Sequence, residues 1–188
     1  MPRLTLAHGT LLALSLVSLP LQAQDHWADA DRQTRRLSPA VFDELPTPVR
    51  FDLERRGCTV PQLWGDTLAR NVVSGRFRHA STTDWAVLCS VDRTSTILVY
   101  WEGRADSVAE IASAPDRAFL QGVGNGRIGF SRAISGVDGH FIRRQFERYG
   151  GREPPPLDHD GINDAFIEKA SLVWYWYNGE WLRLTGTD

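Results

Sequence analysis

The chain has 188 residues, with 21 Lys and Arg against 23 Asp and Glu and a formal net charge of −2. This mildly acidic balance excludes the basic stripe that a nucleic-acid-binding domain needs, and it disfavours electrostatic docking on anionic lipid. The length is enough for one domain with a sizeable hydrophobic core.

The N-terminal region resembles a secretory signal peptide over residues 1–23. Arg3 supplies a positive start, Leu11–Leu21 is almost wholly apolar, and Ala23 offers a small residue for cleavage. The apolar run is shorter than the roughly 20 residues of a membrane span, so we expect no membrane anchor. The protein is therefore predicted to be periplasmic or secreted, with a flexible leader over 24–36 and one globular domain over 37–188.

The chain contains two cysteines, Cys58 and Cys89. Neither has a second cysteine or a histidine at metal-ligand spacing. In an oxidising compartment such a pair usually forms a disulfide. We therefore predict a Cys58–Cys89 bridge that joins the N-terminal segment to a strand.

Two short helices are predicted before Cys58. Ser38 and Thr47 are each followed by proline, a pattern typical of a helix start. Gly57 stands where a helix commonly ends.

Most of the remaining chain shows alternating or short apolar runs, which are typical of strands. Asn178-Gly179 is the strongest hairpin signal, and 151–157, with three consecutive prolines, is an expected extended connector. The fold class is predicted to be mainly β, with antiparallel sheets. The expected strands are Asn71–Arg78, Asp84–Val91, Thr96–Glu102, Val108–Ser113, Ala118–Gly122, Arg127–Ile134, His140–Glu147, Phe166–Tyr177 and Glu180–Leu184.

One segment combines Gly75-Arg76-Phe77 with Asp84-Trp85-Ala86-Val87-Leu88. It resembles the blade unit of FG-GAP and VCBS repeats over about 25 residues. The resemblance implies a propeller-blade hairpin. Its calcium loop does not carry over, because residues 78–83 contain no acid, whereas calcium needs six or more oxygen ligands with several carboxylates.

A second acidic segment has the pattern Asp-x-Asp-Gly-x-x-Asp and resembles the calcium loops of FG-GAP and thrombospondin type 3 repeats. Alternate carboxylates can converge on an ion, and Gly161 permits a sharp turn. The segment is not an EF-hand, because Pro156 and Ile167 stand at the first and last ligand positions. An ordinary acidic turn remains the alternative. The candidate calcium ligands are Asp158, Asp160, Asn163 and Asp164.

The last aromatic run offers a candidate ligand face. On a strand, alternate residues of this run point to opposite sides, so the strand is either buried on both faces or displays rings to a ligand. The candidate ligand-binding residues are Trp174, Tyr175, Trp176, Tyr177 and Trp181.

No catalytic motif is found, and no residue is assigned a catalytic role. We expect an exported, non-enzymatic binding or structural module whose partner is a protein or a carbohydrate, with no cofactor. One alternative is a hydrolase in which Asp158 or Asp160 acts with His159 or His140. The other alternative is a module that calcium stabilises, with calcium as its cofactor.

Overall fold

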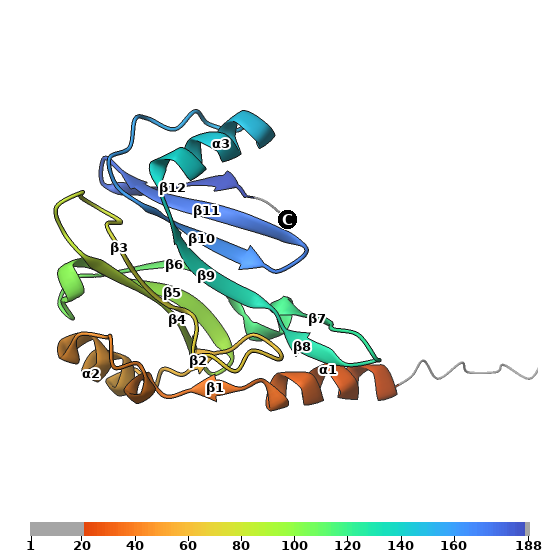
Figure 1. Cartoon of the computed structure of the whole chain (residues 1–188). Helices are drawn as coiled ribbons and strands as arrows, with labels where there is room; N and C mark the ends of the chain where they lie inside the picture. The colour runs from red at the N-terminus through yellow and green to blue at the C-terminus, as the bar shows by residue number, and fades with distance from the viewer. Residues whose placement is uncertain (1–20, 187–188) are drawn as a thin grey trace, which may run out of the picture.

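The structure is a computed structural model that describes residues 21–186 (Figure 1). Residues 1–20 of the expected signal peptide lie outside this range. Within it, no helix is both long and apolar enough to cross a membrane. The helices are α1 (Leu21–Gln33), α2 (Thr47–Arg55) and α3 (Gly139–Tyr149), with 3-10 turns η1 (Pro39–Val41), η2 (Trp101–Gly103) and η3 (Asp116–Phe119). The strands are β1 (Arg36–Leu37), β2 (Val60–Pro61), β3 (Val72–Gly75), β4 (Asp84–Val91), β5 (Thr94–Tyr100), β6 (Val108–Pro115), β7 (Leu120–Gly122), β8 (Ile128–Phe130), β9 (Arg132–Val137), β10 (Gly161–Phe166), β11 (Ala170–Tyr177) and β12 (Glu180–Thr185).

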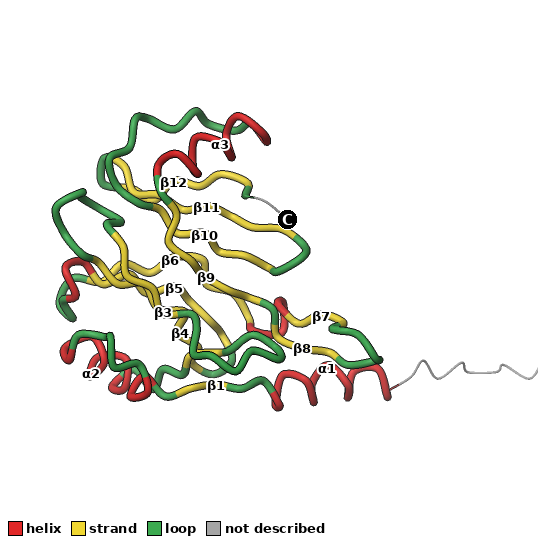
Figure 2. The backbone as a smooth tube through the Cα atoms, in the orientation of Figure 1, coloured by secondary structure: helices red, strands yellow, loops and turns green. Residues whose placement is uncertain are grey.

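Two four-stranded antiparallel sheets form the centre of the fold, in the orders β3-β4-β5-β6 and β12-β11-β10-β9. The sheets pack face to face, with α2 on the outer side of the first sheet and α3 on the outer side of the second (Figures 1 and 2). The predicted mainly β, antiparallel fold class is therefore confirmed.

The alternation of side chains explains why central strands are apolar on both faces. On β4, Ala86 and Leu88 enter the core between the sheets, whereas Val87 and Cys89 pack beneath α2. Successive residues of a strand point to opposite faces, and both faces of these sheets are covered. Each central strand therefore contributes to two cores.

Helix α3 corrects the prediction of a strand over His140–Glu147. The Asp138 carboxylate caps the helix by accepting a hydrogen bond from the Phe141 main-chain N–H at 2.7 Å. Ile142 and Gln145, one turn apart, are both buried against the second sheet. This spacing fits a helix, so the described part of the chain holds three α-helices instead of the two expected near the N-terminus.

The expected strand Phe166–Tyr177 is divided by a turn. Phe166 ends β10, and Ala170 begins β11 directly opposite it. Glu168 adopts a left-handed conformation with φ of 61°, and the Lys169 N–H donates to the Phe166 carbonyl at 3.0 Å. The chain therefore reverses inside a run that is read from the sequence as continuous.

Residues 24–36 were expected to form a flexible leader, but they contain most of α1 and the start of β1. Ala30 packs in the central core, and the Asp31 carboxylate pairs with Arg36 at 2.7 Å and Arg93 at 2.8 Å. Arg36 also pairs with the fully buried Asp116 at 2.7 Å. These contacts join the segment to the domain.

The N-terminal end of the domain follows the predicted signals in part. Ser38 caps only the short turn η1, whereas α2 forms as expected and ends near Gly57, which has a φ of 71°. The predicted disulfide is confirmed: Cys58 and Cys89 are bonded, with their Cα atoms 5.4 Å apart. It ties the end of α2 to β4.

Asp52 on α2 is expected to cause part of the loss of stability of the fold in acid. Burial would raise the pKa of this carboxyl, but hydrogen bonds from Arg56, Arg55 and the Tyr100 hydroxyl outweigh burial and lower the pKa from 3.8. The stabilisation is present above the unfolded pKa and is lost as the pH falls below about 4, through the lower folded pKa. Asp52→Asn should therefore show a shallower loss of unfolding free energy over this acid range than the unmodified protein, measured by urea denaturation at a series of pH values. Equal slopes would contradict this assignment.

Candidate functional site

The loops at one end of the two sheets form a composite depression, which we call the loop-end cleft. They are the β3–β4 loop, the β5–β6 loop with η2, the connector between α3 and β10, and the β11–β12 turn, all toward the left in Figure 1. The cleft consists of three pockets that share wall residues. Chain segments far apart in sequence therefore supply one concave surface.

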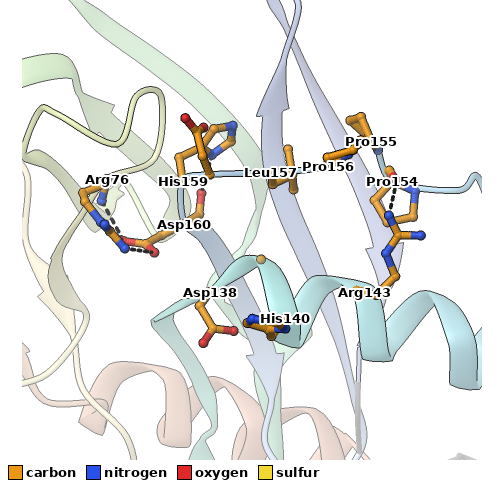
Figure 3. Close-up of a pocket in the computed structure, with 12 residues that line it drawn as sticks. Arg76, Asp138, His140, Arg143, Pro154, Pro155, Pro156, Leu157, His159 and Asp160 are labelled. Atoms are coloured by element: carbon orange, nitrogen blue, oxygen red, sulfur yellow. Dashed lines mark hydrogen bonds and ion pairs between the residues drawn. The ribbon is translucent and has the colours of Figure 1, made fainter.

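The first pocket, the connector pocket, has a volume of about 530 Å³. It lies between the proline-rich connector and the first turns of α3, where Asp138 and His140 stand (Figure 3). Its lining residues are Arg76, Asp138, Gly139, His140, Arg143, Pro154, Pro155, Pro156, Leu157, Asp158, His159 and Asp160. All four residues named in the hydrolase alternative line this pocket.

An Arg76–Asp160 pair closes one side of the connector pocket (Figure 3). Asp160 Oδ2 accepts from the Arg76 main-chain N–H at 2.9 Å and from Nε at 3.3 Å, while Oδ1 accepts from Nη2 at 3.2 Å. The Asp160 N–H donates back to the Arg76 carbonyl at 2.8 Å. Hydrogen bonding to Asp160 raises the pKa of Arg76. The carboxylate therefore joins the connector to the end of β3.

His159 is held by the main chain in the same wall. Its side chain is buried, and Nδ1 lies 3.0 Å from the carbonyl oxygen of Asp160. Because a carbonyl oxygen only accepts hydrogen bonds, Nδ1 must carry the proton. In the neutral ring Nε2 is then the acceptor.

The second pocket, the hairpin pocket, has a volume of about 360 Å³ and shares the connector residues 156–159 with the connector pocket. It joins the tip of the β11–β12 hairpin to the beginning of the acidic segment. The pocket is lined by Arg78, His79, Pro156, Leu157, Asp158, His159, Trp176, Tyr177, Asn178 and Gly179. Aromatic rings and polar side chains thus share one concave surface.

The third pocket, the arginine pocket, has a volume of about 240 Å³ and adjoins the hairpin pocket at Arg78. The Arg78 guanidinium lies over the Trp101 ring, 5.6 Å from its centroid. The pocket is lined by Arg78, Trp101, Glu102, Arg104, Asp106 and Ser107. Sequence reasoning did not select Arg78 or Trp101, because nothing local marks them as neighbours of the hairpin tip.

The predicted aromatic ligand face is mostly core. Trp176 and Trp181 pack with Trp101 at centroid distances of 5.2 and 5.6 Å, and Trp174 packs against the same core. Tyr175 is fully buried on the opposite face of β11, beneath α3. Of the five candidates, only Trp176 and Tyr177 line the hairpin pocket. The strand is thus covered on both faces, which was the alternative to an exposed row of rings.

The four candidate calcium ligands are not brought together. Asp158 is exposed, Asp160 pairs with Arg76, and Asn163 and Asp164 point to opposite faces of β10. Over residues 21–186, no group of three or more His, Cys, Asp or Glu side chains is placed to hold a metal ion. Gly161 also has a different role from the expected turn: a Cβ there would lie 2.7 Å from the Trp174 main-chain oxygen and 3.0 Å from Ile142 Cδ1, so its absence permits close approach of β11 and α3. Calcium binding stays a prediction.

Asp164 belongs to a buried ion pair that the sequence did not reveal. Arg132 is fully buried between the sheets and donates to both Asp164 carboxylate oxygens at 2.8 Å. It also donates to the Ser95 hydroxyl at 3.0 Å and to the Ala112 carbonyl at 2.6 Å. The guanidinium thereby bonds β9 and β10 in one sheet to β5 and β6 in the other.

Comparison with known proteins identifies no relative: no protein-family model, no curated protein and no solved structure matches this chain. The resemblance of residues 75–88 to an FG-GAP blade therefore stays a prediction. Functional assignment depends on the geometry of the cleft.

Proposed function

We propose that this protein is an exported, non-catalytic binding module whose ligand occupies the loop-end cleft. One observation carries the proposal: the hairpin tip with Trp176 and Tyr177 and the acidic segment with Asp158 and His159 line a single pocket. Concave sites that combine ring surfaces with a few polar groups are typical of ligand-binding proteins. Tyrosine and tryptophan offer large contact areas at low entropic cost.

The arrangement of the polar groups supports binding more than hydrolysis. A hydrolytic site needs an acid and a base within hydrogen-bond reach of the reacting group, with the base oriented by a further residue. In this cleft the Asp160 carboxylate is engaged by Arg76, and His159 Nδ1 is engaged by a main-chain carbonyl. Within the described range, no hydrogen bond joins a histidine ring to a carboxylate side chain.

Export is supported by two observations of different kinds. Residues 1–23 match the pattern of a signal peptide, and Cys58 and Cys89 form a disulfide. Disulfides persist in periplasmic and extracellular compartments and are rare in the cytosol.

The proposal predicts that Tyr177→Ala weakens ligand binding about fivefold to tenfold, because removal of a stacked ring costs roughly 1 kcal/mol or more. The measurement is isothermal titration of the disulfide-bonded protein with neutral and acidic oligosaccharides and with short peptides. Tyr149→Ala is the matched control, because Tyr149 is an exposed tyrosine of α3 outside the cleft.

Two results would contradict the proposal. The first is the absence of binding by any of these probes. The second is equal loss of affinity in the Tyr177 and Tyr149 variants, which would place the ligand elsewhere.

A further inference from the structure

The arginines around the loop-end cleft differ in their partners. Arg76 pairs with Asp160, Arg104 with Asp106 at 2.8 Å, and Arg143 with Glu153 at 3.0 Å. Arg78 is the exception: across residues 21–186 no carboxylate pairs with its guanidinium, which lies over the Trp101 ring. An arginine placed against an aromatic ring keeps planar donors that match a carboxylate.

A buried carboxylate positions Arg78 and Trp101 together. Asp84 is fully buried, and its Oδ2 accepts from the Arg78 main-chain N–H at 3.0 Å. Its Oδ1 accepts from the Glu102 N–H at 2.8 Å, so one side chain fixes the loops on both sides of the arginine pocket. Phe77, the residue before Arg78, is also fully buried and anchors the chain at this point. The cation is therefore presented by a preorganised backbone, which lowers the entropic cost of binding.

The hairpin pocket next to Arg78 supplies a different chemistry. Tyr177 and Trp176 contribute ring surface, Asn178 contributes an amide and Asp158 contributes carboxylate acceptors, and His159 also lines the pocket. Asp158 has no ion-pair or hydrogen-bond partner within the described part of the chain. Hydroxyl groups of a ligand would satisfy these acceptors while the flat face of a sugar ring contacts Tyr177.

We infer, on the basis of the proposed binding function, that the ligand is an acidic oligosaccharide whose carboxylate is bound by Arg78. The three pockets adjoin through shared wall residues, so successive sugar rings of one ligand would occupy neighbouring pockets. A peptide is less well matched, because peptides commonly add to an exposed strand edge or insert into an apolar groove. The walls of this cleft are mainly loops and turns of mixed polarity.

The test compares trigalacturonate, trimannuronate, the methyl ester of trigalacturonate and a tripeptide by isothermal titration. We expect the unmodified protein to bind at least one of the two acidic trisaccharides. If trigalacturonate is the one bound, its affinity should exceed that of its methyl ester by about tenfold or more. Arg78→Gln should weaken binding of the acid by about tenfold or more, because this is the loss of affinity that removal of a hydrogen bond to a charged group typically causes. Arg78→Lys should retain part of the affinity, and Arg148→Gln, a change on α3 outside the cleft, should have no effect. Thermal unfolding of each variant checks that it is folded.

The outcomes separate this inference from the proposed function. Equal binding of acid and ester, or an Arg78→Gln variant that binds the acid normally, overturns the acidic-ligand inference while Tyr177-dependent binding of neutral sugars retains the function. Binding of a tripeptide in place of any sugar also overturns only the inference. If neither sugars nor peptides bind, both are overturned.

Discussion

Arg132→Leu is expected to lower the free energy of unfolding by about 3–5 kcal/mol, because it leaves the Asp164 carboxylate buried without its cation. Arg132 is fully buried and bonds to groups of both sheets. The measurement is chemical denaturation followed by tryptophan fluorescence, with Arg144→Leu on the exposed face of α3 as the control, where we expect a change within about 0.5 kcal/mol.

A double variant separates the two causes of this loss. Arg132→Leu combined with Asp164→Leu removes the uncompensated charge, so the pair should recover part of the stability lost in the single variant. A loss below about 1 kcal/mol in the single variant would show that water or another group already neutralises Asp164. That result would contradict the structural role given to the pair.

Removal of the disulfide is expected to have the second large effect. Replacement of both Cys58 and Cys89 by serine should cost about 3–4 kcal/mol in the chain-entropy model, since the two residues are 31 apart in sequence. Denaturation of the oxidised protein, the reduced protein and the double variant gives this value. We expect the variant to be no more stable than the reduced protein, because its two serine hydroxyls are buried in an apolar cluster.

The disulfide experiment also tests the predicted compartment. Intact mass and thiol titration of the protein purified from its native host should show both sulfurs oxidised and residues 1–23 removed. Free thiols on a chain that retains Met1 would contradict export. Equal stability of oxidised and reduced protein would instead contradict only the stabilising role of the bridge.

The elements predicted well are those set by local pattern. The β4 and β12 regions and the Asn178-Gly179 turn follow alternation and turn chemistry, which act over a few residues. The segment of helix α3 was wrongly predicted to be a strand, although the sequence contains a local signal for a helix. Asp138 is a good cap, and Phe141, Ile142 and Gln145 follow helical spacing; the aromatic and β-branched residues there favoured a strand instead.

The candidate site was predictable only in part, for a physical reason. The aromatic hairpin and the acidic segment were selected separately from the sequence, and Tyr177 and Asp158 line one pocket. Arg78 and Trp101 reach that neighbourhood through the buried Asp84. Hydrogen bonds between distant segments leave no periodic trace in a sequence. The same applies to Arg132 and Asp164, which lie 32 residues apart.

A further pocket, separate from the three pockets of the loop-end cleft, gives the cleft assignment an internal control. It has a volume of about 410 Å³ and is lined by Leu63, Trp64, Gln121, Gly122, Val123, Gly124, Phe130, Ser131, Ile167 and Glu168. It shares no residue with the loop-end cleft. A ligand that recognises apolar surface alone would favour this pocket, because Trp64 and Ile167 are exposed there.

Amide and indole chemical shifts of the isotope-labelled, disulfide-bonded protein, followed during titration with an oligosaccharide that binds it, locate the ligand on the molecule. We expect the shifts to concentrate at Arg78, His159 and Tyr177 and to saturate together with one dissociation constant. Shifts confined to Trp64 and Ile167, with the signals of the cleft unmoved, would contradict it.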